Sequence, residues 1–409
     1  MRRLRLLTVL LLSCAALACV GRGGDGDSLA PIVREALGAS AAIARRVRAD
    51  DDVSCAFAAG ELTGSLSIEQ RVAQLFFVTP ESLVSDYTDE VVTAAGDATR
   101  QALAERPVGG IIYFQQNLVD ADQTTEMLRA TADHALEACG VPILLAVDEE
   151  GGTVSRIGGN EGFAVENVGD MRDVGETADA DHARDVAAHM GSYLRDLGFT
   201  ADFAPVADIA SNPESDTMAR RSFGSDAELV ARMVAAQVRG LRSQHVICCA
   251  KHFPGIGRAE GDSHDGAVYS HRTADEMATE ELVPFAAAIE AGVPMIMVGH
   301  ISCPELTGDD LPASLSSEVM QGLLREGLGF GGVVVTDSLG MGAVVGRYGH
   351  GRVAVEAFLA GADALLMPED FDAAYQAMLD AVASGEVSEA RLAESVYRIV
   401  HMKLQGARR

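Results

Sequence analysis

The segment from Lys251 to His264 holds the residues with the clearest chemical potential. It opens with Lys251-His252 and ends with Asp262 two positions before His264, and three glycines lie between them. An aspartate beside an imidazole can hold one tautomer and raise the imidazole pKa, which suits a group that first donates and later removes a proton. Glycines let the backbone approach a ligand closely. The segment therefore predicts a general acid/base in a loop that faces a ligand.

Four further apolar runs are followed by ionisable side chains. They lead into Asp148-Glu149-Glu150, into Asp208 and then Arg220-Arg221, into Gly299-His300, and into Thr336-Asp337-Ser338. Folding gains nothing from gathering charges where apolar runs stop, because ionised groups are costly to bury. The pattern therefore indicates one polar site built from the ends of several strands.

The elements that must position these residues are eight short apolar runs separated by helical patterns. Continuous apolar strands between helices indicate a parallel sheet covered on both faces, and eight of them predict a (β/α)₈ barrel of the TIM type. A doubly wound open sheet is the alternative, although no glycine-rich fingerprint follows the first run. The strand-like runs are 73–78, 108–114, 141–147, 199–205, 246–251, 293–298, 332–336 and 364–367, and the clearest helical patterns are 179–197, 226–244 and 275–291.

The composition limits the partners of this site. The chain has 409 residues, 48% of them hydrophobic, so it has ample apolar material for a core. The net charge of −28 repels phosphate backbones, which argues against a nucleic acid as partner. Tryptophan is absent and aromatic residues make up 5%. A sugar site in this chain must therefore depend on hydrogen bonds more than on stacked rings.

The first residues have the layout of an export signal. Arg2, Arg3 and Arg5 precede the apolar run 6–12, and small residues then lead to Cys19. The apolar run is too short to span a bilayer. A cysteine after small residues in this position resembles a bacterial lipoprotein signal. We therefore expect an exported protein of the cell envelope or periplasm, with its only membrane attachment a lipid at Cys19.

This interpretation divides the chain into residues 1–19 as signal peptide, 20–60 as tether and N-terminal helical segment, and 61–409 as the barrel domain. Two alternatives stay open. Cys14 with Leu11 fits the leucine rule of lipoprotein signals better but leaves a very short signal. An ordinary secreted protein is the other.

Five cysteines follow the signal. An odd number in an exported protein leaves at least one thiol unpaired or joined to another chain, and a bridge between Cys55 and Cys139 stays open. No pair has the spacing of metal ligands, and neither a metal nor an organic cofactor is expected. The five are Cys55, Cys139, Cys248, Cys249 and Cys303.

Three motifs together resemble a known family. They are Lys251-His252-Phe253-Pro254-Gly255 with Asp262-Ser263-His264, Asp148-x-Glu150-Gly151-Gly152, and Val335-Thr336-Asp337-Ser338-Leu339. Their combination is similar to the family 3 glycoside hydrolases, specifically the single-domain bacterial β-N-acetylhexosaminidases. The resemblance covers the chain from about Leu66 to the C-terminal helical patterns.

The resemblance implies retaining hydrolysis of terminal β-linked N-acetylhexosamine, usually N-acetylglucosamine. Asp337 would attack the anomeric carbon and form a glycosyl-enzyme intermediate. His264 would protonate the leaving oxygen and later deprotonate water, with Asp262 orienting the imidazole. Asp148 would accept hydrogen bonds from sugar hydroxyls. The donors around the ring and the acetamido group would be Arg156, Arg221, Lys251 and His252.

Some positions depart from the family pattern or permit another interpretation. Ile256, Thr153 and the segment 218–220 differ, which affects the subsite beyond the hydrolysed sugar rather than the reaction. Arg221 could instead form a structural ion pair with Asp208 or Asp202.

Three other functions compete with this one. A glycoside phosphorylase would use the same barrel and pass the sugar to phosphate. A β-glucosidase or xylosidase of the family usually takes its acid/base from a second domain. A non-catalytic sugar-binding lipoprotein would not need Asp337. We expect a monomer that acts on an amino-sugar oligosaccharide.

Overall fold

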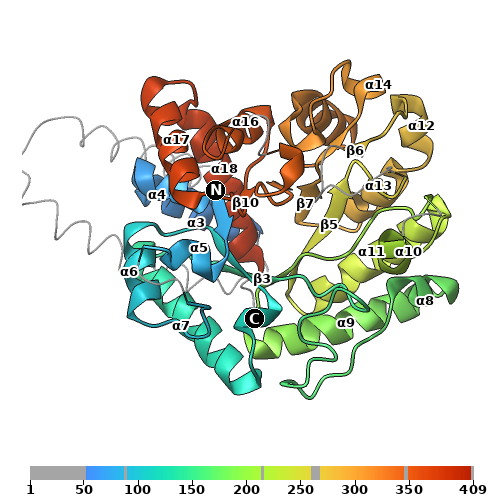
Figure 1. Cartoon of the computed structure of the whole chain (residues 1–409), viewed down its shortest axis with the longest axis horizontal. Helices are drawn as coiled ribbons and strands as arrows, with labels where there is room; N and C mark the ends of the chain where they lie inside the picture. The colour runs from blue at the N-terminus through green and yellow to red at the C-terminus, as the bar shows by residue number, and fades with distance from the viewer. Residues whose placement is uncertain (1–51, 87–89, 213–215, 259–267, 345–348, 407–409) are drawn as a thin grey trace, which may run out of the picture.

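The computed structural model describes residues 52–86, 90–212, 216–258, 268–344 and 349–406. Eight parallel strands lie at its centre and helices form an outer ring (Figure 1). Each strand overlaps one of the eight apolar runs, so the predicted strands are confirmed. They are β1 (Phe76–Val78), β2 (Gly110–Tyr113), β3 (Leu144–Val147), β4 (Ala201–Asp202), β5 (Ile247–Phe253), β7 (Met295–Val298), β9 (Val333–Thr336) and β10 (Leu365–Leu366).

The strands form a barrel rather than an open sheet. Their order is β10-β1-β2-β3-β4-β5-β7-β9, which follows the chain. The two ends of this series meet through a parallel bridge between Val335 and Ala364. The amide of Thr336 donates to the carbonyl of Ala364 over 3.1 Å. The predicted (β/α)₈ barrel is therefore confirmed, and the doubly wound sheet is excluded.

The strands are apolar because both of their faces are covered. Every residue of β3, β7 and β9 is buried. Side chains on one face fill the barrel, and those on the other face pack under helices. The outer layer contains α4 (Ile68–Gln74), α5 (Pro80–Val84), α6 (Asp97–Glu105), α7 (Ala121–Cys139), α8 (Met171–Glu176), α9 (Ala180–Leu197), α11 (Ala227–Ser243), the π-helix η3 (Glu318–Gly327), α16 (Arg352–Ala360) and α17 (Phe371–Ser384).

Two of the three helical patterns named above are continuous helices, α9 and α11. A glycine lets this pair approach closely, because a Cβ on Gly240 would lie 2.4 Å from the carbonyl oxygen of Arg184. The third pattern, 275–291, is wrong as a single helix. It is divided into α12 (Ala274–Thr279) and α13 (Leu282–Glu290). The break falls at Glu280 and Glu281, whose carboxylates pair with Arg272 at 2.8 and 3.3 Å.

The first and last described helices, α3 (Asp52–Ser65) and α18 (Glu389–Gly406), pack against each other. Helix α18 passes behind the strands in Figure 1. It lies at the amino ends of the strands, where a Cβ on Gly406 would meet Ile247 at 2.7 Å and Lys403 donates to Gln74 over 2.9 Å. The predicted signal, Cys19 and most of the predicted N-terminal helical segment lie outside the described residues.

The described cysteines form no disulfide. No disulfide joins Cys55 to Cys139, and all five described cysteines are buried. Across the part of the chain that the structure describes, no helix has the length and apolarity needed to cross a bilayer.

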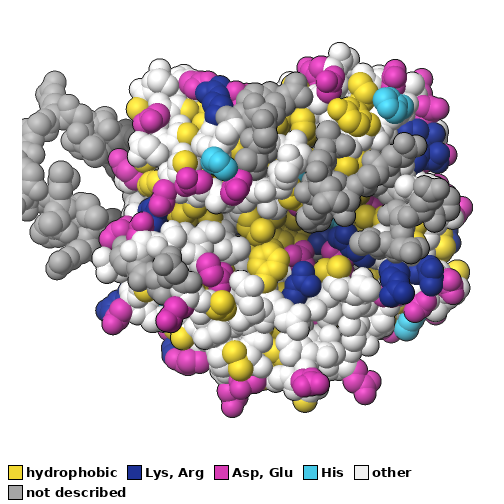
Figure 2. All heavy atoms as spheres, in the orientation of Figure 1, with side chains coloured by type: hydrophobic (Ala, Val, Ile, Leu, Met, Phe, Trp, Pro, Cys, Tyr) yellow, Lys and Arg dark blue, Asp and Glu magenta, His cyan; other side chains and the backbone are white. Residues whose placement is uncertain are grey.

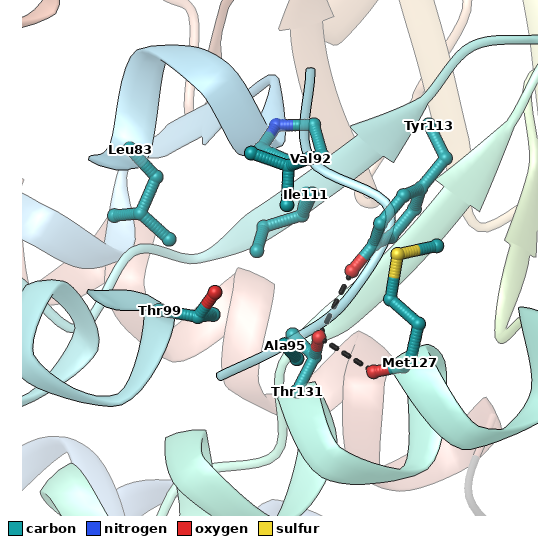
Figure 3. Close-up of a pocket in the computed structure, with 9 residues that line it drawn as sticks. Leu83, Val92, Ala95, Thr99, Ile111, Tyr113, Met127 and Thr131 are labelled. Atoms are coloured by element: carbon teal, nitrogen blue, oxygen red, sulfur yellow. Dashed lines mark hydrogen bonds between the residues drawn. The ribbon is translucent and has the colours of Figure 1, made fainter. Parts of the chain in front are cut away.

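A small apolar cavity lies outside the barrel, between β2 and helices α5 to α7 (Figure 3). The Tyr113 hydroxyl lies 3.1 Å from Thr131 Oγ1, which donates to the Met127 carbonyl. None of the predicted site residues lines this cavity. It is therefore a packing defect of the helical layer and is separate from the site described next.

Candidate active site

The predicted site residues gather at the carboxyl ends of the strands, the end at which chemistry occurs in such barrels. Lys251, near the end of β5, lies at their centre and is buried. Its Nζ is 2.6 Å from Asp148 Oδ1 and 2.6 Å from Glu150 Oε1. Burial opposes the charge on the ammonium, but the two carboxylates raise the pKa of Lys251 above its usual value. Lys251 is therefore a permanent cation in the barrel mouth.

Arg221, the last residue of α10 (Asp216–Arg221), pairs with Glu150 in a two-bond arrangement. Nε and Nη2 donate to the two carboxylate oxygens over 2.7 and 2.8 Å. The expected alternative, an ion pair of Arg221 with Asp208 or Asp202, is wrong in its partner, because Arg221 pairs with Glu150, Asp208 holds His252, and Asp202 Oδ1 accepts from the Glu149 amide. Burial opposes the ionisation of Glu150, but Lys251 and Arg221 lower its pKa well below the usual range.

His252 is held by Asp208. The carboxylate Oδ2 lies 2.8 Å from His252 Nδ1 and also accepts from the His252 backbone amide over 3.1 Å. The other oxygen accepts from the amide of Ile256 over 2.7 Å. Because Nδ1 faces an acceptor, it carries the proton, and Nε2 points toward Arg221 at 3.5 Å. Asp208 thus fixes both the ring orientation and the loop that follows β5.

Asp337 follows β9 directly and is half-buried. Its amide donates to the Val298 carbonyl over 2.9 Å, which anchors it to β7, and Ser338 N donates to its Oδ1 over 2.8 Å. Burial alone would raise the pKa of Asp337. The electrostatic influence of His252, His300 and Lys251, together with the hydrogen bond from the Ser338 amide, outweighs burial and lowers the pKa of Asp337. Asp337 is therefore an ionised carboxylate at the carboxyl end of β9, the state that a nucleophile requires.

His300, after β7, is a second imidazole in the site. Its Nδ1 lies 2.6 Å from Ser314 Oγ, and its Nε2 lies 2.8 Å from the Ser338 carbonyl. The residue is buried. It supports the turn that presents Asp337, so its contribution is to the position and charge state of that carboxylate.

Arg156 lies in the loop after β3 and is half-buried. Its guanidinium carbon is 5.8 Å from the centroid of the Phe114 ring. It makes no ion pair with Lys251's partners Asp148 and Glu150. The structure thus brings Asp148, Arg221, Lys251, His252 and Asp337 into one site from three strands, β3, β5 and β9, and the helix α10, and places Arg156 on a neighbouring loop. Asp262 and His264 lie outside the described residues.

Several residues of the site had no predicted role. Glu150 and Asp208 bind Lys251, Arg221 and His252, and His300 supports Asp337. Each of these residues follows an apolar run, and this pattern predicts only that the residue lies at the carboxyl end of the barrel. Their partners come from other strands, so a linear pattern does not reveal which of them touch. Among the described residues, no three His, Cys, Asp or Glu side chains are arranged to hold a metal ion.

Comparison with known proteins places this geometry in a family. Residues 67–402 match the model of the glycosyl hydrolase family 3 N terminal domain. The chain belongs to glycoside hydrolase family 3. The resemblance found in the sequence motifs is therefore confirmed, and this family 3 chain is a glycoside hydrolase.

Relatives of this family 3 enzyme extend over most of its length. Beta-hexosaminidase LpqI of Mycobacterium tuberculosis is 35% identical over 362 residues, which cover 86% of each chain. The structure of a family 3 beta-N-acetylglucosaminidase from Paenibacillus sp. str. FPU-7 superposes with a TM-score of 0.77 at 38% identity; it covers 84% of this chain and 63% of that one. The β-glucoside phosphorylase BglX superposes with a TM-score of 0.75 at 26% identity, over 86% and 61% of the two chains.

Proposed function

We propose that this enzyme removes terminal β-linked N-acetylhexosamine, typically N-acetylglucosamine, from the non-reducing end of an oligosaccharide. The observation that carries the proposal is the state of Asp337, an ionised carboxylate at a strand end beside His252, His300 and Lys251. The names of the relatives, beta-hexosaminidase and beta-N-acetylglucosaminidase, support the choice of sugar.

The reaction proceeds in two steps with Asp337 as the nucleophile. One Asp337 oxygen attacks the anomeric carbon, the glycosidic C–O bond breaks, and the leaving oxygen takes a proton from His264. His264 then removes a proton from water, which attacks the anomeric carbon and releases Asp337. Asp262 orients the His264 imidazole. Two inversions at one carbon give a product of retained β configuration.

Binding of the sugar uses the ion-paired groups of the mouth. Asp148 gives one oxygen to Lys251 and has the other for a sugar hydroxyl. Lys251 and Arg221 donate around the ring, and Glu150 holds both cations in place. His252, expected as a third donor, gives its Nδ1 proton to Asp208 and has Nε2 as an acceptor near Arg221. Arg156 donates from the loop after β3. The cations and carboxylates of the site already neutralise one another. A neutral ligand with many hydroxyl groups can therefore bind without leaving any of these protein charges unpaired.

The test is product analysis with chitobiose and with a muropeptide disaccharide. We expect N-acetylglucosamine released first as the β anomer, observed by proton NMR before mutarotation. Asp337→Ala should abolish turnover, and a 5-fluoro glycosyl fluoride should label Asp337, as found by peptide mass spectrometry. Release of the α anomer, or full turnover by Asp337→Ala, would reject the mechanism.

A phosphorylase remains a second candidate because the phosphorylase BglX has the same barrel. Assays with and without inorganic phosphate distinguish the two. Hydrolysis is independent of phosphate and gives the free sugar, whereas phosphorolysis requires phosphate and gives a sugar 1-phosphate. The same assays with β-glucosides test the glucosidase alternative.

We also propose export and lipid attachment at Cys19, supported by the arginine-rich start and the apolar run 6–12. Expression with an alkyne-labelled fatty acid should label the full chain, and Cys19→Ser should remove the label. Retention of the label in Cys19→Ser with loss in Cys14→Ser would move the attachment to Cys14.

A further inference from the structure

Glu149 is a fully buried carboxylate that takes no part in the ion pairs of the mouth. Its Oε1 accepts three hydrogen bonds. The donors are Ser155 Oγ at 2.6 Å, Gly158 N at 2.9 Å and the Tyr193 hydroxyl at 2.8 Å. A buried carboxylate needs such donors, because an ionised oxygen without them is strongly destabilised.

The other oxygen of Glu149 organises the same loop. Its Oε2 accepts from the backbone amides of Arg156 over 2.6 Å and Ile157 over 3.0 Å. Four of the five donors to Glu149 thus come from residues 155–158. Among the described residues, no lysine or arginine side chain is paired with Glu149. Its function is to bind a loop, not to neutralise a cation.

The neighbours of Glu149 in the chain face the catalytic site. Asp148 and Glu150 both contact Lys251 Nζ at 2.6 Å. Between them, the Glu149 side chain turns to the loop instead. A backbone hydrogen bond from Glu149 N to Asp202 Oδ1 over 2.9 Å fixes this arrangement against β4. The segment 148–150 therefore ties the loop 155–158 rigidly to the sugar-binding carboxylates.

Arg156 is the residue that this arrangement places. Its amide is among the two closest donors to Glu149, and its carbonyl accepts from Asn160 Nδ2 over 3.0 Å. Lys251 and Arg221 are both paired with carboxylates, but among the described residues no carboxylate pairs with Arg156. Its guanidinium, near the Phe114 ring, keeps its donors for a ligand.

We propose that Glu149 is a positioning residue that acts on the substrate through Arg156. This inference rests on the proposed function, in which Arg156 donates to the amino sugar. Glu149 holds the Arg156 backbone from one side, and the Phe114 ring supports the guanidinium from the other. The loop is thus set before the sugar binds, which removes the cost of ordering it during binding.

The proposal requires a carboxylate at this position, not merely a side chain of that size. Three of the five groups around Glu149 are backbone N–H groups, which cannot accept: Gly158 N at one oxygen, and Arg156 N and Ile157 N at the other. In Glu149→Gln the NH₂ group faces at least one of them in either orientation, so the amide leaves a loop donor without an acceptor. We expect kcat/KM for a 4-methylumbelliferyl N-acetylglucosaminide to fall by roughly 10- to 100-fold, the size of losing one charge-assisted contact with the substrate.

Two hydroxyl donors to the same Glu149 oxygen give a matched comparison in variants that keep the carboxylate. Ser155→Ala removes a donor that belongs to the loop, and Tyr193→Phe removes one from α9. We expect Ser155→Ala to lower kcat/KM about three- to tenfold and Tyr193→Phe less than about twofold. If the two changes lower kcat/KM equally, Glu149 does not act on the substrate through the loop 155–158.

A double-mutant cycle gives the decisive result. Kinetics and the inhibition constant of free N-acetylglucosamine are measured for Glu149→Gln, Arg156→Ala and the double variant, with thermal unfolding as the check on folding. If Glu149 acts through Arg156, the double variant is no worse than Arg156→Ala alone. If the loss of kcat/KM in the double variant equals the product of the two single losses, the proposal is wrong. If Glu149→Gln does not fold, the same cycle is made with Ser155→Ala.

The result also separates this inference from the proposed function. An inactive wild-type enzyme on N-acetylglucosaminides would reject both. An active wild type with an unaffected Arg156→Ala variant would reject the role of Arg156 and of Glu149, but would leave the hydrolase assignment intact.

Discussion

Glu150 and Lys251 form a buried ion pair, with 2.6 Å between Oε1 and Nζ and only 2% and 3% of the two side chains exposed. Glu150 also binds Arg221, and Asp148 binds Lys251, so two carboxylates balance two cations. Removing one partner of a buried pair leaves an uncompensated charge, which is more costly than the pair itself is favourable.

Glu150→Gln should therefore destabilise the fold as well as the site. We expect the free energy of unfolding to fall by roughly 3–5 kcal/mol, measured by urea denaturation. The exposed pair of Arg129 with Glu126 is the control, and Glu126→Gln should change the free energy of unfolding far less than Glu150→Gln. If both variants lose equally little free energy of unfolding, Glu150 is not needed to compensate the charges of Lys251 and Arg221.

The acid limb of the pH profile should report Asp337. Its pKa is lowered, so kcat/KM persists as the pH falls past the usual value of 3.8 and is lost only when the pH passes the folded-state pKa. Its stabilising contribution follows the same course, present above 3.8 and lost below the lowered pKa. His300→Gln removes one of the groups that lower the pKa of Asp337, so the acid limb should move to higher pH.

The matched control is His350→Gln, because His350 pairs with Glu369 at the surface. This change should leave the acid limb in place. An acid limb that stays unmoved in His300→Gln would show that His300 does not set the charge state of Asp337.

Gly257 should not tolerate a side chain. A Cβ at this position would lie 1.8 Å from the Ile209 carbonyl oxygen, and the Gly257 carbonyl accepts from Asn212 over 3.0 Å. Gly257→Ala must therefore move the backbone that follows His252, and kcat/KM should fall by at least about tenfold. Gly64→Ala, in α3 with no atom within 4 Å of the new Cβ, should keep full activity and gain up to about 1 kcal/mol of stability.

Lys403 should make stability depend on pH above neutrality. Burial lowers the pKa of Lys403 to about 7, against an ordinary value of 10.5, and Cys139 opposes this only in part. Between these values the unfolded chain binds more protons than the folded one, so the stability of the fold rises with pH. From pH 7 to pH 9 the gain should be roughly 1–3 kcal/mol, and Lys403→Met should lack it. Parallel pH curves for the two proteins would contradict this.

The barrel is predictable from sequence because its signal is local. Each strand of a doubly covered parallel sheet is a short apolar run, and polar side chains follow where it reaches the mouth. Asp337, Lys251, His252 and Asp148 could be placed there for the same reason. The division of 275–291 into α12 and α13 could not, because Arg258 and Arg272 hold Glu280 and Glu281 from outside the segment.

The partners inside the site are not predictable in the same way. Glu150, rather than Asp208 or Asp202, binds Arg221, and Asp208 binds His252 instead. Glu150 and Asp208 both follow strands, while Arg221 comes from α10, and the sequence does not specify which of these side chains meet at the carboxyl end of the barrel. The direction of Glu149, away from its two neighbours, depends likewise on the loop it binds.

Helix α18 lies across the amino ends of the strands, with Lys403 and Leu404 buried in that layer. Helix α18 thus covers the amino end of the barrel, and the face in view in Figure 2 is the opposite one, where basic, acidic and apolar side chains meet near the centre. Substrate and products must then enter and leave at that carboxyl end. Under the proposed mechanism, the shortened glycan must leave through this end before water can enter and hydrolyse the glycosyl-enzyme intermediate. For long glycans, release of the shortened chain should then limit kcat.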